Sequence, residues 1–299
     1  LQESDGAKVV FPPGFHNRDN EPLPLIIQAT TGGFNYATSD LTCVIDRVER
    51  LGADLLLYVI GAPQAQHLRM VFEVARMAGW LQPPAEAVHV SFGSVLGDDR
   101  KMLRSRTGDS VKLIDLLDEA VERAAAAIAE KNPELDGDAR ADVARMIGIG
   151  AVKYSDLSTD RIKDYVFDWD RMLAFEGNTA PYLQYAHARI CSIFRRSGVD
   201  RSDVRGSAIG LAEPQERALV QRLLAYPSAL AETINTYSPH KLCTYLFDLA
   251  QDFSSFYEHC PVMKADEPVR TSRLALCDVT ARTLEHGLGL LGIAAPEAM

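Results

Sequence analysis

The sequence predicts an α/β domain followed by an all-α domain, and two patterns along the chain carry this prediction. In the first third, short apolar runs of strand length alternate with amphipathic stretches of helix length, as in a parallel sheet with crossover helices. From residue 111 onward, apolar residues recur at helical spacing almost throughout. We therefore expect a partial Rossmann-like sheet in residues 1–110 and a helical bundle in residues 111–299.

The α/β part is predicted to form one strand–helix–strand–helix–strand unit. Residues 1–24 are rich in Pro, Gly, Asn and Asp and indicate a hairpin or loop. Strands are expected at 25–28, 55–60 and 88–92, and helices at 38–51 and 64–78. Thr38 or Ser39 is the expected N-cap of the first helix. Three parallel strands make only half of a doubly wound sheet and leave an apolar edge uncovered.

The helical part is predicted to contain a series of helices joined by short loops. They are expected near 111–131, 138–155, 178–197, 214–225, 227–236, 239–259 and 267–288. Pro214, Pro227 and Pro239 fall where a first turn begins, because a missing N–H costs nothing there, and Ser238 is the expected cap before Pro239. One buried face of 239–259 is predicted to hold Leu242, Leu246, Leu249, Phe253 and Phe256.

Composition limits the class of protein. The 299 residues are 47% hydrophobic and 24% charged, as in an ordinary globular protein, and their first residue, Leu1, indicates a processed or partial product. No apolar run approaches the roughly 20 residues that span a bilayer, so we expect a cytoplasmic protein without membrane contact. The five cysteines are scattered without a C-x-x-C pair, which favours reduced thiols and no protein-bound metal site. A net charge of −10 argues against non-specific coating of nucleic acid but leaves room for a local basic stripe.

The stretch 175–196, FEGNTAPYLQYAHARICSIFRR, predicts a helix capped by Asn178 or Thr179 with two stripes. One stripe is apolar, with Leu183, Ala186, Ile190 and Ile193 or Phe194. The other interleaves rings with cations: Tyr182, Tyr185, Arg189, Ser192 and Arg196. Such a stripe suits stacking on bases and contact with phosphates. Spacing alone, however, favours the solvated side of an ordinary amphipathic helix.

The same stretch closely resembles the EGNTAPYLQYAHAR signature of arginyl-tRNA synthetases, a class I family. The likeness extends from about residue 10 to residue 299, and the segments from HKLCTYLF onward resemble the family's anticodon-binding bundle. The resemblance implies that residues 1–110 are the second half of the catalytic fold and that residues 111–299 bind tRNA. It also implies that Tyr182, Tyr185, Arg189 and Arg196 contact tRNA.

The segment FNYATSDL resembles the family's arginine-pocket motif Y-A-T-T-D-L-A. The resemblance implies that Tyr36 and Asp40 bind arginine together with Gln64, and that His67 lies near the nucleotide. A carboxylate and a phenol suit the planar donor fork of a guanidinium. Without the family likeness, Asp40 would be read as a carboxylate favoured by the helix dipole and His67 as an ordinary histidine.

The loop 101–108, KMLRSRTG, resembles the family's version of the class I Lys-Met-Ser-Lys-Ser loop. The resemblance implies that Lys101, Arg104, Ser105 and Arg106 are catalytic and stabilise the pyrophosphate leaving group when ATP, with Mg²⁺, activates arginine. A solvated basic loop is the alternative interpretation.

Parts of the family's active site have no counterpart in these residues. No histidine stands in a His-x-Gly-His pattern, and the family's Lys-Ser-Asp-Gly turn reads Ala29-Thr30-Thr31-Gly32. The resemblance therefore implies one portion of an arginine–tRNA ligase with tRNA(Arg), arginine and ATP as partners, which needs a missing N-terminal half. The isolated chain is expected to be inactive. The alternative is a stand-alone tRNA-binding module or a decayed paralogue without ligase activity.

Overall fold

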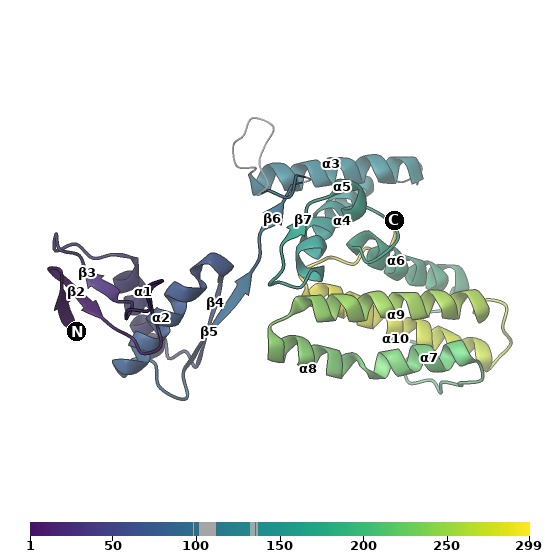
Figure 1. Cartoon of the computed structure of the whole chain (residues 1–299). Helices are drawn as coiled ribbons and strands as arrows, with labels where there is room; N and C mark the ends of the chain where they lie inside the picture. The colour runs from purple at the N-terminus through teal and green to yellow at the C-terminus, as the bar shows by residue number, and fades with distance from the viewer. Residues whose placement is uncertain (98, 102–111, 132–134, 136) are drawn as a thin grey trace. The chain divides into compact units, whose positions relative to one another are not determined.

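The computed structural model describes residues 1–97, 99–101, 112–131, 135 and 137–299 (Figure 1). These residues divide into two units, the N-terminal unit Leu1–Ser94 and the helical unit Val95–Met299. Each buried core cluster lies within one of the two units. The domain boundary expected after residue 110 stays a prediction.

The N-terminal unit contains two small sheets. Strands β1 (Gln2–Ser4), β2 (Ala7–Val10) and β3 (Leu25–Gln28) form an antiparallel sheet in that order. Strands β4 (Leu55–Gly61) and β5 (Glu86–Phe92) pair in parallel over their whole length. The parallel pair confirms the α/β class. β3 forms where it was expected but pairs antiparallel with β2 instead of joining the parallel strands, because the hairpin preceding it offers a nearby edge.

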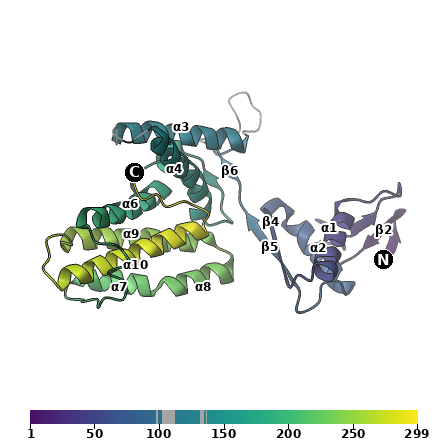
Figure 2. The ribbon, with the colours of Figure 1, turned by 180° about the vertical axis from the view of Figure 1, so that it is seen from behind.

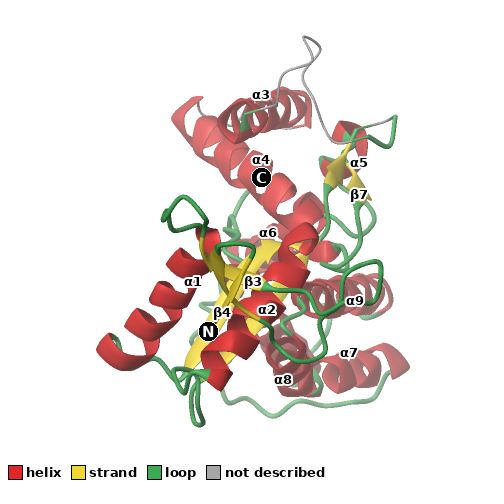
Figure 3. Ribbon diagram, turned by 60° about the vertical axis from the view of Figure 1, so that its left-hand side comes forward, coloured by secondary structure: helices red, strands yellow, loops and turns green. Residues whose placement is uncertain are grey.

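Two helices pack on each other and on these strands (Figure 3). α1 (Tyr36–Ile45) continues through a π-helical turn (Asp46–Arg50), and Gly52 ends it with a φ of +65°. α2 (Ala65–Met77) follows a 3₁₀ turn (Ala62–Gln64). The cap of α1 is Asn35, whose side chain accepts from the Ala37 N–H at 3.1 Å, so the expected cap at Thr38 or Ser39 is wrong. The Thr38 hydroxyl instead donates to the Ile27 carbonyl of β3.

Strand β4 presents an apolar face to solvent. Leu55, Leu57 and Val59 are 47%, 45% and 65% exposed, whereas the alternating residues Leu56 and Tyr58 are buried in the core with α1 and α2. A groove of about 430 Å³ runs along this strand. Within the described residues, β4 is hydrogen-bonded to a strand on one side only. In the described part of the chain, β4 thus has the unpaired edge that the sequence predicts and, in addition, an exposed apolar face.

The helical unit contains the seven predicted helices within a few residues of their expected ends (Figure 2). They are α3 (Leu113–Lys131), α4 (Gly137–Ser158), α6 (Ala180–Ser197), α7 (Pro214–Leu224), α8 (Tyr226–Thr236), α9 (Pro239–His259) and α10 (Val269–Leu290). The parallel strands β6 (Val95–Leu96) and β7 (Tyr165–Val166) and the short helix α5 (Trp169–Met172) were not predicted, because two to four residues show no periodicity. Among the described helices, none combines the length and apolarity that a membrane span requires.

Helix α9 forms the centre of the helical unit, in contact with α4, α6, α7, α8 and α10. Its five predicted core residues, Leu242, Leu246, Leu249, Phe253 and Phe256, are at most 2% exposed. Ser238 precedes it at the N-cap position, but its hydroxyl donates to the Thr236 carbonyl and makes no cap hydrogen bond. The cap position is thus confirmed and the expected capping interaction is not.

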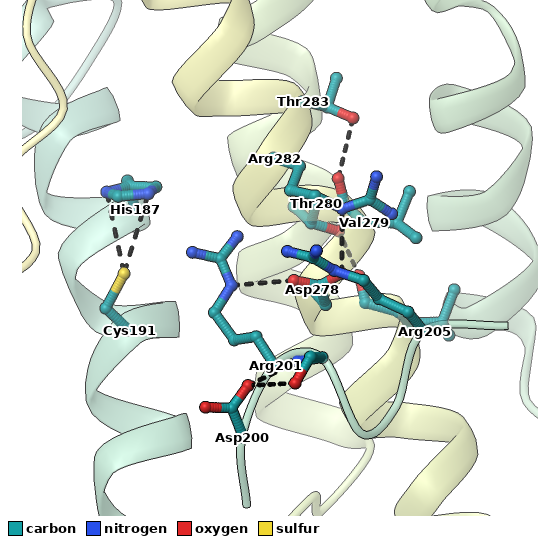
Figure 4. Close-up of polar contacts among 12 residues, drawn as sticks. His187, Cys191, Asp200, Arg201, Arg205, Asp278, Val279, Thr280, Arg282 and Thr283 are labelled. Carbon is teal, nitrogen blue, oxygen red and sulfur yellow. Dashed lines mark hydrogen bonds and ion pairs between the residues drawn. The ribbon is translucent and has the colours of Figure 1, made fainter. Parts of the chain in front are cut away.

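Two buried carboxylates tie the helices together. The side chain of Asp278 in α10 is 2% exposed and forms ion pairs with three arginines (Figure 4). Its carboxylate oxygens lie 2.8 Å from Nε of Arg201, 2.9 Å from Nε of Arg282 and 3.6 Å from Nε of Arg205. Glu216 of α7, also 2% exposed, pairs with Arg273 of α10 at 2.8 Å. Because a buried charge is costly without partners, these pairs fix how α7, α10 and the loop after α6 meet.

The segment after α10, residues 292–297, lies along α4 and α6. Side chains of these helices donate hydrogen bonds to its backbone carbonyls: Lys153 to Gly292, Gln184 to Ala294, His187 to Pro296 and Arg195 to Glu297, at 2.5, 2.8, 3.0 and 2.9 Å. Gln184 and His187 are 0% and 1% exposed. The segment therefore supplies backbone acceptors to the buried side chains Gln184 and His187 and to the exposed side chains Lys153 and Arg195.

Candidate functional site

The candidate arginine-binding residues of α1 lie on one helical face. Tyr36 is the first residue of α1 and is 86% exposed. Asp40 follows four residues later, and its side chain is 36% exposed. Because residues four apart on a helix are neighbours, the phenol and the carboxylate point from the same side of α1. Cap formation by Asn35 places both residues inside the helix and gives them this common face.

Asp40 is joined to His67 of α2. The Nε2 atom of His67 lies 2.6 Å from Oδ2 of Asp40, and the two side chains are 29% and 36% exposed. The family likeness assigned these residues to two different subsites, for arginine and for the nucleotide. No local pattern could have paired them, because they stand 27 residues apart and meet only through the packing of α1 on α2.

Gln64 lies at the start of α2, one helical turn before His67. It ends the 3₁₀ turn Ala62–Gln64 and occupies the N-cap position of α2 without a side-chain cap bond, with its side chain exposed. Residues three apart on a helix share a face, so Gln64 and His67 point from the same side of α2. The four candidates Tyr36, Asp40, Gln64 and His67 thus stand at the beginnings of two helices that pack together.

A buried tyrosine lies beneath this pair of helices. Burial raises the pKa of Tyr58 above its ordinary value, against the opposing effect of the nearby Arg47. The Arg47 guanidinium stands over the Tyr58 ring at 5.1 Å. Neither residue was singled out from the sequence, since an aromatic residue inside an apolar strand indicates only core packing.

The candidate catalytic loop is described only at its first residue. Lys101 is exposed and forms a 4.0 Å ion pair with Asp99. Arg104, Ser105 and Arg106 lie outside the described residues. Among the residues that are described, no group of three or more His, Cys, Asp or Glu side chains could hold a metal ion.

The candidate tRNA-binding stripe of α6, defined by Tyr182, Tyr185, Arg189 and Arg196, has two kinds of member. Tyr185 is 48% exposed and Arg196 is also exposed. Tyr182 and Arg189 are only partly exposed, because each meets an aromatic ring of α9. Two members of the stripe, Tyr185 and Arg196, are therefore accessible to solvent, and the other two pack against α9.

Two rings of α9 extend this surface. The ring of Phe247 lies 5.6 Å from that of Tyr182, and the Arg189 guanidinium stands 4.2 Å above the ring of Tyr257. Phe247 and Tyr257 flank the buried face of α9 and were not predicted from the sequence, because rings at helical spacing indicate core packing. Thr179 accepts from the Tyr182 N–H and is the cap of α6, as one of the two expected alternatives.

Comparison with known proteins decides the family. A model of the catalytic domain of class I tRNA synthetases (R) matches residues 1–169, and a model of the DALR anticodon binding domain matches residues 183–299. The chain belongs to the arginyl-tRNA synthetase family. The catalytic-domain match continues past the end of the N-terminal unit at Ser94 and reaches α5, whereas the anticodon-domain match begins within α6.

Relatives of this synthetase family are similar over nearly all of the chain. An arginine–tRNA ligase of Thermobifida fusca is 57% identical over 297 residues, covering 99% of this chain and 51% of the relative. One from Cellvibrio japonicus is 50% identical, covering 99% and 52%. The arginyl-tRNA synthetase structures from Plasmodium falciparum and Thermus thermophilus both match with a TM-score of 0.86, at 29% and 30% identity. The matched regions cover 100% and 99% of this chain, and 50% and 55% of the respective synthetase chains. The chain thus spans about half the length of these relatives.

Proposed function

We propose that this chain is part of an enzyme that ligates arginine to tRNA(Arg) at the expense of ATP. It would supply the arginine-recognition residues and the anticodon-binding surface. The observation that carries the proposal is the set of exposed Tyr36 and Gln64 and partly exposed Asp40 at the starts of two packed helices, in a chain of the arginyl-tRNA synthetase family. The five unpaired thiols agree with a reducing compartment such as the cytoplasm.

Arginine binding is the first step of the proposed reaction. The Asp40 carboxylate would pair with the substrate guanidinium, with the Tyr36 phenol and the Gln64 amide completing its hydrogen bonds. A carboxylate accepts two parallel N–H bonds from a guanidinium, which gives both affinity and discrimination against lysine. The partial exposure of Asp40 supports this role, because a substrate must be able to reach it.

Activation by ATP is the second step, and only part of its machinery belongs to this chain. Lys101, Arg104, Ser105 and Arg106 would stabilise the charge that develops on the pyrophosphate, and Mg²⁺ would arrive with the ATP phosphates. The His-x-Gly-His pattern has no counterpart here, so we expect no arginine-dependent ATP–pyrophosphate exchange from the 299-residue chain. Loss of even one preorganised group costs about 10²–10³ in rate. Exchange by the pure chain would contradict this expectation.

A missing N-terminal half is the partner that the N-terminal unit requires. The uncovered face of β4, with Leu55, Leu57 and Val59 exposed, supports this part of the proposal, as does the chain's coverage of about half of its relatives. An edge strand with an exposed apolar face is a template for another strand.

The α6 stripe with Phe247 and Tyr257 is the proposed anticodon-binding surface. Exposed rings can stack on unpaired bases, and the arginines can contact phosphates. Pre-packing of Arg189 on Tyr257 holds its guanidinium in place and lowers the ordering cost of binding.

Titration of an anticodon stem-loop at several salt concentrations tests this surface. We expect Tyr185→Ala to weaken binding by about 1–3 kcal/mol, and Arg196→Ala to reduce the log–log salt slope by about one. Arg69→Ala, on exposed α2 surface of the other unit, is the control. Unchanged affinity and slope in both stripe variants would reduce the stripe to a solvated helix face.

Calorimetry with arginine tests the other half of the proposal. We expect Asp40→Asn to lose roughly 2–5 kcal/mol of binding, because the guanidinium would lose its charged partner. Equal affinity of the wild type and Asp40→Asn would leave Asp40 as a helix-start carboxylate. Stem-loop binding without any arginine binding would favour the alternative, a tRNA-binding module without ligase activity.

A further inference from the structure

We propose that His67 is a positioning residue that holds the Asp40 carboxylate in the orientation that receives a guanidinium. The inference rests on the proposed function, because it gives His67 a role in the arginine pocket in place of the nucleotide subsite. It starts from the contact of 2.6 Å between His67 Nε2 and Asp40 Oδ2, which links α2 to α1.

The contact restricts a side chain that would otherwise be mobile. Asp40 is about one-third exposed, and a free aspartate at such a position samples several χ1 wells and a broad χ2 range. A short hydrogen bond to a charged acceptor is among the stronger polar contacts. Fixing the carboxylate before the substrate arrives removes part of the ordering cost from the binding step.

The hydrogen bond leaves acceptor capacity for a ligand. An ionised carboxylate has about four lone-pair sites, and His67 uses one of them on Oδ2. Among the described residues, His67 is the side-chain partner of the Asp40 carboxylate. Oδ1 and the second lone pair of Oδ2 can therefore accept the two parallel N–H groups of a guanidinium.

An imidazole suits this role better than a lysine or an arginine. An imidazole N–H can donate to the carboxylate without the permanent positive charge that a lysine or an arginine carries. A permanent cation at the same place would compete with the substrate guanidinium for Asp40. The helical spacing also couples the two sides of the pocket, because His67 lies one turn from Gln64 as Asp40 lies one turn from Tyr36.

The first arm of the test is ¹⁵N NMR of the histidine side chains in the 299-residue chain. We expect the ¹⁵N shifts of His67 to report an Nε2–H donor in the wild type and to change in Asp40→Ala, which has no acceptor for this N–H. His89 is the internal control, since its Nε2 donates to the Ile60 carbonyl at 2.8 Å in the same unit and should not change. A His67 spectrum that is the same in both proteins would overturn the inference.

The second arm is an arginine titration of His67→Phe and His67→Gln. Phenylalanine keeps a ring but has no donor, and we expect it to weaken arginine binding about tenfold, as for loss of one charged hydrogen bond. Glutamine keeps an N–H donor at similar reach and should restore most of the affinity. Circular dichroism and thermal melts confirm that both variants fold.

The two arms separate failure of the inference from failure of the proposed function. Arginine binding that is lost in Asp40→Asn but equal in wild type and His67→Phe would overturn the positioning role and leave the arginine site standing. Equal weakening in His67→Phe and His67→Gln would also overturn it, because the donor would then not matter. If the wild type binds no arginine, the proposed site fails in the isolated chain, and the NMR arm alone decides whether His67 holds Asp40.

Discussion

At the scale of single residues, the buried pair of Glu216 and Arg273 dominates the electrostatics between α7 and α10. The side chains are 2% and 10% exposed. Glu216→Ala would leave the guanidinium buried without its counter-charge, so we expect a loss of about 3–5 kcal/mol in the free energy of unfolding. Equilibrium unfolding in urea measures this loss in the free energy of unfolding. The control is Glu232→Ala, because Glu232 is 60% exposed in its pair with Lys241 and should cost less than about 1 kcal/mol. Similar losses in both variants would contradict the prediction.

The same carboxyl gives stability a pH dependence. Burial raises the pKa of Glu216, but hydrogen bonds from the Glu213 N–H and the Arg273 guanidinium outweigh burial, and the net pKa lies below its ordinary value. Because the pKa is lower in the folded state, the contribution is present above the unfolded pKa of about 4.3 and is lost as pH falls through the folded pKa. We expect the urea midpoint of wild type to fall more steeply below about pH 5 than that of Glu216→Gln. Urea midpoints that fall in parallel with pH in the wild type and Glu216→Gln would contradict this role of Glu216.

Residue roles could be predicted where a local motif determines them and not where packing does. Tyr36 and Asp40 share a helical face because they stand four residues apart, which the sequence already indicates. Contacts of Asp40 with His67 and of Arg189 with Tyr257 join different helices, and no spacing rule relates such positions. The cap at Asn35 was missed because Asn, Thr and Ser stand close together, and all three are good caps.

At the scale of elements, the long helices were predictable because prolines, caps and apolar periodicity agree along each of them. The partner of β3 was not predictable in the same way. The sequence of a four-residue strand such as Leu25–Gln28 does not indicate whether it pairs with β2 or with β4. That choice depends on which edge lies within reach once the hairpin has formed.

The close approach of α3 and α4 gives a test at a single glycine. A Cβ on Gly148 would lie 2.7 Å from backbone atoms of Ala120 and Val121, which cannot move as a side chain can. Alanine normally stabilises a helix by roughly 0.5–1 kcal/mol over glycine, but the clash should reverse this gain and destabilise by about 1–3 kcal/mol. Gly289→Ala in α10 is the matched control, since nothing lies within 4 Å of its Cβ position. A rise in melting temperature for Gly148→Ala would show that the helices can separate.

The hydrogen bonds of Gln184 test the segment 292–297 as an element. Its side-chain N–H₂ donates to the carbonyls of Met146 and Ala294, at 3.1 and 2.8 Å. Gln184→Met keeps the length of the side chain but removes both hydrogen bonds. The Met146 carbonyl keeps its place in the α4 hydrogen-bond ladder, so we expect a cost of about 1–3 kcal/mol from the Ala294 carbonyl that loses this donor. Gln251→Met, at an exposed position of α9, should stay within about 0.5 kcal/mol of wild type in urea unfolding. Equal midpoints would mean that the segment contributes nothing to stability.

At the scale of the whole molecule, the two units carry separate cores and should unfold separately. Each unit contains one of the two tryptophans, Trp80 and Trp169. We expect Trp169→Phe and Trp80→Phe to report two different urea midpoints, with the N-terminal unit unfolding first because its parallel sheet has an uncovered apolar face. Coincident midpoints from the two single-tryptophan proteins would instead indicate one cooperative molecule.

Segment 292–297 also bears on the order of events during synthesis. A ribosome makes α4 and α6 long before it makes the residues that accept hydrogen bonds from Lys153, Gln184 and His187. Until those carbonyls emerge, Gln184 can still donate to the Met146 carbonyl, but His187 must bond to water or stay without this acceptor. The final packing of the helical unit therefore waits for the last stretch of the 299 residues, although its helices can form earlier. The helical unit should accordingly reach its native protease resistance late in translation, only after the segment that follows α10 has left the exit tunnel.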